Sequence, residues 1–266
     1  MPSKLNKLFA YLLSMLIGGA LIASAQSEPS SAKSRLDTII ARGTLQFGIP
    51  GDYAPFGVLD KNTNQWSGMD IDEATSMAKA LGVRLEIVKT SWPTLLSDLQ
   101  AGKFDIAGGG ISISLERQKY AFFSTPILQD GKTPITRCEN VDRFSTLADI
   151  DKPGVRVITP KGGTNESFDR SHLTHATILV DTDNQGIFKE LVAGQADVMI
   201  TDATETRVQH KLHPELCPVH PDHPFNFVEK AYMMPRDIAL QQWVNAFLHL
   251  QEKTGELNTV VQHWLQ

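Results

Sequence analysis

The segment GGISISLER, from Gly109 to Arg117, combines residue types that suit the binding of a carboxylate. Glycines let backbone N–H groups come close to a ligand. Ser112 adds a hydroxyl donor, and the guanidinium of Arg117 can hold a carboxylate through two parallel hydrogen bonds. The same pattern is also typical of a strand end, a loop and a surface arginine. It therefore indicates an anion site only together with other segments.

A second segment puts two carboxyl side chains one helical turn apart. Asp202 follows the apolar stretch from Val198 to Ile200, and Glu205 comes three residues later, so both side chains can face one cleft. The sequence from Asp202 to Glu205 also has the spacing of a capping box, in which the two side chains satisfy backbone N–H groups at the start of a helix. From the residues alone, helix capping and a role in chemistry are both open.

A third segment, Gly162-Gly163-Thr164-Asn165, is expected to be a turn that leads into a helix. The first turn of a helix favours an anion, because its backbone N–H groups lack partners and the helix dipole is positive there. The alternative is an ordinary turn followed by a helix cap.

The composition is that of an ordinary globular protein and argues against a nucleic-acid partner. The chain has 266 residues, 41% hydrophobic and 21% charged, with a formal net charge of −5. No cluster of lysine and arginine follows a path suited to phosphates. The length allows one large domain or two small ones. No P-loop, dinucleotide fingerprint or nucleophile elbow is found, and no cofactor is expected.

The N-terminus predicts export. Lys4 and Lys7 precede an apolar run from Leu8 to Ile22, and Ala23-Ser24-Ala25 fits a cleavage site, so residues 1–25 are expected to be a signal peptide and residues 26–34 a linker. A membrane anchor is the less favoured alternative, because the apolar run is short. We expect a soluble protein in a bacterial periplasm, with no membrane contact after cleavage. Nothing in the sequence fixes an oligomeric state.

Export also bears on the two cysteines. An oxidising compartment makes one disulfide between Cys138 and Cys217 the simplest interpretation, with two free, buried thiols as the alternative. Neither cysteine has the spacing of a zinc site. The segments His213-Pro214-Glu215 and His220-Pro221-Asp222-His223-Pro224 match no established ligand spacing, and their prolines prevent one regular helix. No metal site is expected.

Strands and helices are predicted to alternate in two successive series that meet near residues 131–135. Helices are expected over residues 35–41, 70–81, 93–101, 166–172, 184–193, 203–212 and most of 236–265, and strands over 45–49, 84–88, 105–107, 155–158, 177–180 and 198–200. This alternation predicts an α/β protein with sheets rich in parallel strands. A cleft between two such units is the usual location of a ligand site.

The sequence after the predicted signal peptide resembles the type II periplasmic solute-binding proteins of the polar amino-acid class. The resemblance is carried by GDYAPF (51–56), WSGMDID (66–72), the run over 92–126, GGTNESF (162–168) and GQADVMITDA (194–203). It implies an α/β, two-lobe periplasmic-binding-protein-like (type II) fold with a hinge and a central ligand cleft. Lobe 1 would comprise residues 35–130 and 225–266, and lobe 2 residues 131–224. Chain crossings near 129–135 and 221–228 would form the hinge, and closure would exclude water.

Within that family the chain is similar to the cyclohexadienyl dehydratases, periplasmic enzymes that act on prephenate and arogenate. The similarity rests on TSWP (90–93), DGKTPIT (130–136), GGTNE (162–166), TDA (201–203) and LHPELC (212–217). It implies a carbon–oxygen lyase of phenylalanine biosynthesis, which converts prephenate to phenylpyruvate and arogenate to phenylalanine with loss of water and CO₂. The alternative within the fold is a polar amino-acid-binding protein of an ABC transporter, without catalysis.

The resemblance also implies where the ligand binds. Its α-carboxylate would be held by Gly110, Ser112, Arg117, Thr164 and Asn165, its α-ammonium group by Asp202, and its ring by Tyr53 and Trp92. Donors for the ring carboxylate stay open among Lys132, Lys161 and backbone N–H groups.

The chemistry needs one acid. Hydroxide leaves the ring poorly unless it is protonated, so a general acid is the minimum equipment. A carboxyl group keeps its proton near neutral pH only if desolvation raises its pKa. The resemblance gives this role to Glu205, and a solvent-facing capping residue without chemistry is the alternative.

Overall fold

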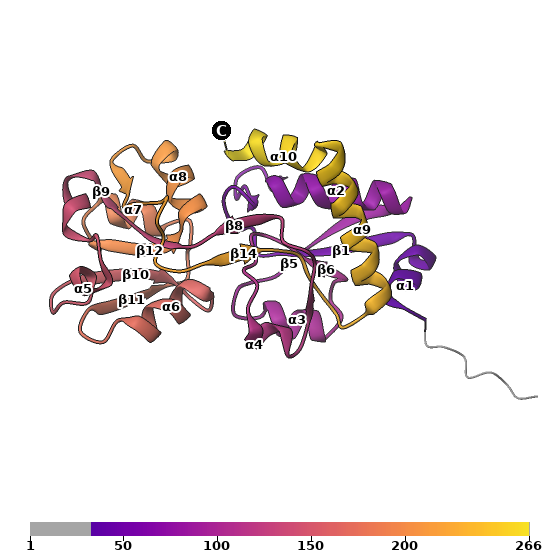
Figure 1. The fold of residues 1–266 in the computed structure, drawn as a ribbon, viewed down its shortest axis with the longest axis horizontal. Helices are drawn as coiled ribbons and strands as arrows, with labels where there is room; N and C mark the ends of the chain where they lie inside the picture. The colour runs from indigo at the N-terminus through magenta and orange to yellow at the C-terminus, as the bar shows by residue number, and fades with distance from the viewer. Residues whose placement is uncertain (1–32, 266) are drawn as a thin grey trace, which may run out of the picture. The chain divides into compact units, whose positions relative to one another are not determined.

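Residues 33–265 are described by a computed structural model (Figure 1). The predicted signal peptide and residues 26–32 of the predicted linker lie outside the described residues. Between residues 33 and 265, no helix combines the length and the apolar character that crossing a bilayer requires.

The first sheet is mixed and has the strand order β5-β1-β6-β15-β7. β1 (Thr44–Ile49) pairs in parallel with β5 (Arg84–Lys89) and β6 (Ile106–Ala107), and β15 (Met233–Met234) runs antiparallel to β6 and β7 (Phe122–Phe123). The apolar side chains of β1 are buried in a core that includes residues of α1, α2 and α9. This sheet therefore joins the N-terminal part of the chain to a strand near residue 233.

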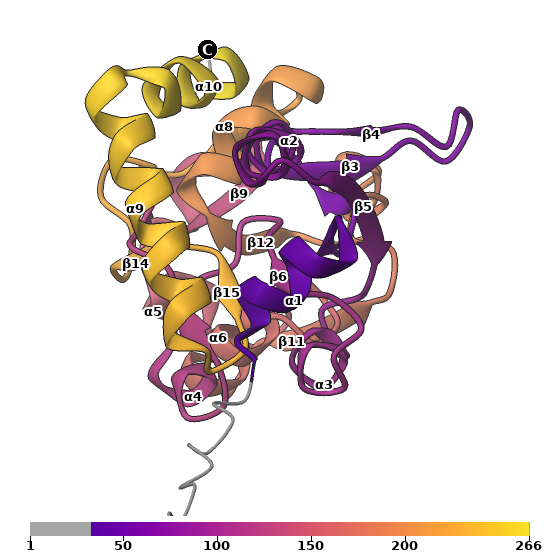
Figure 2. The same ribbon diagram turned by 90° about the vertical axis from the view of Figure 1, so that its right-hand side faces the viewer.

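Helices and a small sheet surround the first sheet. The helices are α1 (Arg35–Arg42), α2 (Met69–Leu81), α3 (Leu95–Gln100), α4 (Leu115–Gln118), α9 (Ile238–Thr254) and α10 (Glu256–Leu265). The small antiparallel sheet consists of β2 (Asp52–Tyr53), β3 (Gly57–Leu59) and β4 (Trp66–Ser67). Figure 2 shows the β3–β4 hairpin extending away from the other elements.

The second sheet has the order β11-β10-β12-β9-β13. Its strands are β9 (Lys132–Arg137), β10 (Arg156–Pro160), β11 (Thr177–Asp181), β12 (Val198–Asp202) and β13 (Leu216–Pro218), and its helical segments are η1 (Cys138–Arg143), α5 (Leu147–Ile150), α6 (Thr164–His172), α7 (Ile187–Val192) and α8 (Ala203–Leu212). β10 is parallel to β11 and β12, whereas β9 is antiparallel to β12 and β13.

Two short strands run between the sheets in Figure 1. β8 (Leu128–Asp130) and β14 (Val228–Lys230) pair antiparallel, with Asp130 opposite Val228 and Leu128 opposite Lys230. The chain therefore passes from one sheet to the other and back along a single two-stranded ribbon.

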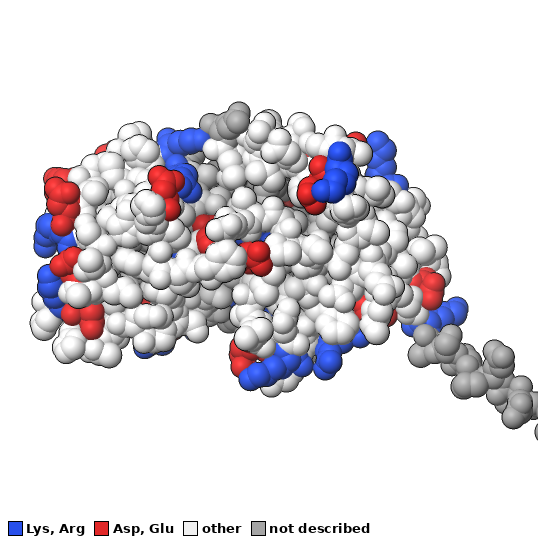
Figure 3. Space-filling view, in the orientation of Figure 1, with Lys and Arg blue, Asp and Glu red and all other residues white. Residues whose placement is uncertain are grey.

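On the face in Figure 3, positive and negative side chains are interspersed.

Three sequence-based expectations need correction. The sheets are mixed rather than rich in parallel strands. α3 begins at Leu95 and not at Pro93, because the backbone forms a turn in which the Thr94 N–H donates to the Ser91 carbonyl at 3.1 Å. α7 begins at Ile187, and Asn184 precedes it, donating through Nδ2 to the backbone oxygen of Asp52 at 3.1 Å.

Candidate functional site

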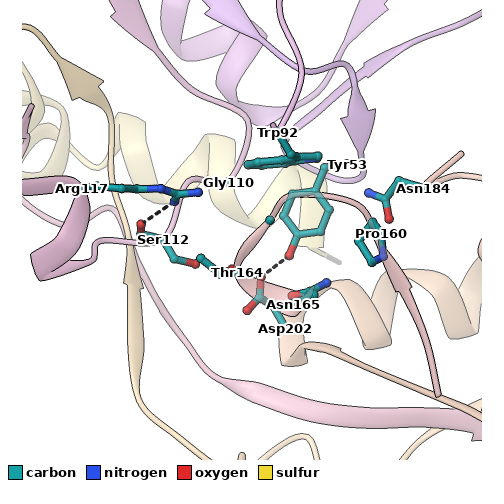
Figure 4. Close-up of a pocket in the computed structure, with 11 residues that line it drawn as sticks. Tyr53, Trp92, Gly110, Ser112, Arg117, Pro160, Thr164, Asn165, Asn184 and Asp202 are labelled. Atoms are coloured by element: carbon teal, nitrogen blue, oxygen red, sulfur yellow. Dashed lines mark hydrogen bonds between the residues drawn. The ribbon is translucent and has the colours of Figure 1, made fainter. Parts of the chain in front are cut away.

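One pocket, with an empty volume of about 340 Å³, collects residues that are far apart in the sequence (Figure 4). Its lining consists of Tyr53, Trp92, Gly110, Ser112, Arg117, Pro160, Gly163, Thr164, Asn165, Asn184 and Asp202. Every residue expected to touch a ligand lies in this lining, and Glu205 does not.

Asp202, the last residue of β12, is held by the chain's own cations. Its Oδ1 accepts from Nζ of Lys132 at 2.7 Å, and its Oδ2 accepts from Nζ of Lys230 and from the Tyr53 hydroxyl, the latter at 2.5 Å. Burial by itself would raise the pKa of Asp202, but the two lysines lower it below its usual range. The carboxylate of Asp202 is thus paired with two ammonium groups of the chain itself.

The two lysines reach Asp202 from different elements. Lys132 begins β9 and is the direct cross-strand partner of Asp202 on β12. Lys230 ends β14, donates to Oγ of Ser112 at 3.0 Å and lies 5.5 Å from the ring centroid of Tyr53. The sequence analysis missed Lys230. The sequence does contain one indication of its role. Lys230 is a single cation directly before the apolar run that starts at Ala231, and it follows the second predicted hinge crossing near residues 221–228.

Arg117 lies in the short helix α4, whose first turn is capped by the Ser114 hydroxyl. Its Nη1 donates to the backbone oxygen of Ser112 at 3.1 Å, and burial lowers its pKa. Figure 4 shows the guanidinium pointing towards Gly110 and Ser112 at one end of the pocket. Since a guanidinium has five donors, this one bond leaves a fork available for a carboxylate.

The backbone of Gly110 has a different role from the expected one. The N–H groups of Gly109 and Gly110 both donate to Oδ2 of Asp70, at 2.6 and 2.9 Å. Asp70 is buried near the start of α2, which raises its pKa, and the Tyr232 hydroxyl donates to its Oδ1 at 3.1 Å. The N–H of Gly110 is therefore used within the chain, while Gly110 itself lines the pocket.

Glycine at position 110 is required by packing. Its φ is +73°, and a Cβ there would lie 2.6 Å from the Tyr53 ring and 2.5 Å from the Phe56 ring. Tyr53 and Phe56 stack with their centroids 5.2 Å apart, and Trp92 meets Tyr53 edge-on at 5.8 Å. Nε1 of Trp92 donates to Oδ1 of Asp52 at 2.9 Å. These contacts build an aromatic wall beside the pocket.

Glu205 lies in the first turn of α8 and is 1% exposed. Its Oε2 accepts from the Thr201 hydroxyl at 2.5 Å, and Oε1 has no hydrogen-bond partner in the part of the chain that is described. Burial raises the pKa of Glu205 to about 8. The capping-box alternative is wrong, because the Asp202 side chain makes no capping bond and Glu205 is not solvent-facing.

A chain of hydrogen bonds connects this carboxyl group to the pocket. Lys132 donates through Nζ to Oδ1 of Asn165, and Nδ2 of Asn165 donates to Oγ1 of Thr201 at 2.9 Å. Thr201 then donates to Glu205. Asn165 lines the pocket, so Glu205 is two hydrogen bonds away from a lining residue. Sequence reasoning gave Thr201 no role, although it directly precedes Asp202 in the segment used for the resemblance.

The two lysines considered for the ring carboxylate differ in position. Nζ of Lys132 also donates to Oγ1 of Thr164 at 3.2 Å, directly behind the lining. Lys161 instead borders an adjacent hollow, together with Asp52 and Trp92 among others. Lys132 is thus nearer to the pocket than Lys161.

The predicted disulfide between Cys138 and Cys217 is present. Within residues 33–265, the one cluster with three potential metal ligands consists of these two sulfurs and His210. Because the sulfurs are bonded to each other, they are not thiolate ligands.

Residues 45–266 match the family described as bacterial extracellular solute-binding proteins, family 3. The chain is 49% identical over 260 residues to the cyclohexadienyl dehydratase of Pseudomonas aeruginosa, with 98% of this chain and 96% of the relative covered. It is 26% identical over 199 residues to the L-cystine-binding protein TcyJ of Escherichia coli, with 75% and 74% covered.

Among solved structures, an ancestral amino acid-binding protein, a precursor of cyclohexadienyl dehydratase, has a TM-score of 0.82 and 36% identity, with 88% of this chain and 100% of that chain covered. An ancestral cyclohexadienyl dehydratase has a TM-score of 0.55 and 50% identity, with 88% and 97% covered. The fold is thus the α/β type II periplasmic-binding architecture, and the chain belongs to the bacterial extracellular solute-binding proteins, family 3.

Proposed function

We propose that this chain is a periplasmic dehydratase that converts prephenate to phenylpyruvate, water and CO₂, and that acts on arogenate as a second substrate. The observation that carries the proposal is Glu205, a buried carboxyl group beside the pocket with its pKa raised to about 8. An acid with this pKa is protonated at neutral pH and can protonate a leaving hydroxyl group. A protein that only binds an amino acid has no need of it.

The reaction balances with one acid. The electron pair of the bond to the ring carboxylate moves into the ring as CO₂ forms, and the C–O bond breaks as the hydroxyl takes the proton of Glu205. Water leaves, the ring becomes aromatic, and Glu205 is left as a carboxylate that regains a proton from solvent. Arg117 anchors the side-chain carboxylate, and Tyr53 and Trp92 shape the space for the ring.

Substrate entry requires a rearrangement. The Tyr53 hydroxyl is bonded to Asp202, and Glu205 is separated from the cavity by the pocket lining. We therefore propose that residues 35–130 and 225–266 form one lobe and residues 131–224 the other, and that the lobes separate at the β8–β14 ribbon. The family description and the predicted leader support a periplasmic location.

The test is the addition of purified protein to prephenate in metal-free buffer, with phenylpyruvate followed by its ultraviolet absorbance in alkali. Glu205→Gln is the matched variant, because it keeps the shape of the side chain and lacks the acidic proton. We expect turnover that falls by roughly 10²–10⁴ in the variant. Full activity in a folded Glu205→Gln protein would show that another group is the acid.

A second candidate is an amino-acid-binding protein without catalysis. It is favoured by the TM-score of 0.82 with the ancestral amino acid-binding protein, which exceeds that with the ancestral dehydratase. Tight calorimetric binding of a polar amino acid, with prephenate consumed only at its spontaneous rate, would support this candidate and contradict the dehydratase.

A further inference from the structure

We infer that the pocket selects a ligand whose side chain ends in an α-keto acid and discriminates against one that carries an α-ammonium group. This inference rests on the proposed function and names its preferred substrate, prephenate over arogenate. These two molecules differ only at that position: prephenate has a neutral keto group, and arogenate has a positive charge.

The basis is the saturation of Asp202, the one carboxylate in the pocket lining. Both of its oxygens accept from ammonium groups, Oδ1 from Lys132 and Oδ2 from Lys230, and the Tyr53 hydroxyl also donates to Oδ2. An incoming ligand ammonium would compete with two cations that are already within hydrogen-bond distance.

Neither lysine is free to withdraw. Nζ of Lys132 also donates to Asn165 and Thr164, and Nζ of Lys230 also donates to Ser112. Both side chains are 1% exposed, so withdrawal would leave a buried ammonium group without its carboxylate. Breaking a buried ion pair in this way is strongly unfavourable.

The other acidic groups near Lys230 lie outside the lining. Asp70 accepts from two glycine N–H groups and Tyr232. Asp130 accepts through Oδ1 from the backbone N–H groups of Gly131 and Thr204, and its Oδ2 is buried without a partner among the described residues. Neither belongs to the pocket lining. A ligand ammonium group therefore finds no unpaired carboxylate in the lining. Lys132 and Lys230, which lie behind the lining, repel its positive charge.

A keto oxygen fits the same surroundings without this repulsion. It carries no charge and needs only a donor, which the Ser112 hydroxyl can supply, because its oxygen accepts from Lys230 and its own proton is left to donate. The carboxylate next to it is favoured by the same excess of positive charge, together with Arg117. The site thus accepts an anionic side chain and disfavours a zwitterionic one.

The experiment measures kcat/KM for prephenate and for arogenate with the same enzyme preparation, following phenylpyruvate and phenylalanine. The ratio of the two values does not depend on the fraction of folded protein. We expect prephenate to be favoured by at least about tenfold, which corresponds to about 1.4 kcal/mol. A ratio at or below one would overturn the inference while leaving the dehydratase assignment intact.

A pair of variants tests the cause. Lys230→Met removes the charge at similar length and leaves the Tyr53 hydroxyl as the donor to Oδ2 of Asp202. A ligand ammonium group then meets less repulsion, so the ratio should fall by about tenfold, towards one. Lys230→Arg keeps the charge and should keep the preference for prephenate. An unchanged ratio in Lys230→Met would overturn the role of this lysine in selection.

Binding separates this inference from the proposed function. Calorimetry on the Glu205→Gln variant, in which turnover is slow, compares the binding of prephenate with that of arogenate, and tighter binding of prephenate is expected. If the wild-type protein converted neither compound but this preference persisted, the dehydratase assignment would fail and the selectivity would stand. Equal or tighter binding of arogenate would overturn the selectivity.

Discussion

The Thr201 hydroxyl donates a hydrogen bond to Oε2 of Glu205 across 2.5 Å, at the junction of β12 and α8. The other carboxyl oxygen of Glu205, Oε1, has no partner among residues 33–265. The acid of the proposed reaction is therefore oriented by a neighbouring hydroxyl, which Asn165 holds in turn.

Thr201→Val removes this donor at nearly constant volume. The hydrogen bond from Thr201 lowers the pKa of Glu205, so its loss should raise that pKa above about 8 and leave the carboxyl group free to turn. We expect roughly a tenfold loss of kcat and a basic limb of the pH–rate profile shifted to higher pH. The control, Thr201→Ser, keeps the hydroxyl and should retain both values. Equal profiles for all three proteins would assign Thr201 to packing.

The pH dependence of the wild-type enzyme follows from the state of Glu205. The group acts as an acid, so activity is present below its pKa of about 8 and is lost as the pH rises through that value. We expect kcat/KM for prephenate to fall about tenfold per pH unit above the pKa. Residual activity of Glu205→Gln should lack this limb. A wild-type profile that stays flat to pH 10 would be incompatible with the assignment.

Tyr53→Phe removes the hydroxyl that joins β2 to Asp202. The wild-type contact links residues of the two proposed lobes, so its loss should favour lobe separation in the ligand-free protein. Small-angle X-ray scattering should give a larger radius of gyration for the free variant, and saturating phenylpyruvate should restore the wild-type value. Identical radii for free wild-type and variant proteins would show that this bond does not hold the lobes together.

The stability of the fold is expected to depend on pH through Glu73, a residue outside the pocket lining. Its carboxyl group is buried, and burial together with the nearby charge of Asp70 raises its pKa from 4.5 to about 7, although Gln251 acts in the opposite direction. The folded state thus keeps a proton that the unfolded state loses. Stability from this group is fully present below pH 4.5 and declines as the pH rises towards 7, by at most about 3 kcal/mol.

Glu73→Gln should remove that decline. We expect equal urea midpoints for variant and wild type at pH 4 and a higher midpoint for the variant at pH 8. Glu86→Gln, at an exposed position on β5, is the control and should follow the wild type at both values. A variant that is less stable than wild type at pH 8 would mean that the charged form of Glu73 is stabilised in the fold.

The sequence predicted the order of helices and strands because apolar periodicity and glycine stops are local signals. α2, α8 and the break at Gly255 agree closely with the expected ranges. It failed where a distant contact decides the local structure. Asn184 was assigned to a helix, yet its amide is used by Asp52, 132 residues away.

In the candidate site, too, local signals were read correctly and distant contacts were not. Short segments located eight of the eleven lining residues, and Pro160, Gly163 and Asn184 were not predicted. The segments could not specify which groups bond to one another. The capping box at Asp202 was plausible locally and is absent, because Lys132 and Lys230 take its oxygens. Lys230 becomes part of the site only through the pairing of β14 with β8, a relationship between residues about 100 positions apart.

The three hydrogen-bond partners of Asp202 come from different elements of the fold. Lys132 is its neighbour on the adjacent strand of the same sheet, whereas Lys230 comes from the connecting ribbon and Tyr53 from the vicinity of the other sheet. Separation of the sheets would keep the contact with Lys132 and break the one with the Tyr53 hydroxyl. In a catalytic cycle with such an opening, the time that product stays bound is governed by the contacts of Asp202, independently of how fast Glu205 transfers its proton.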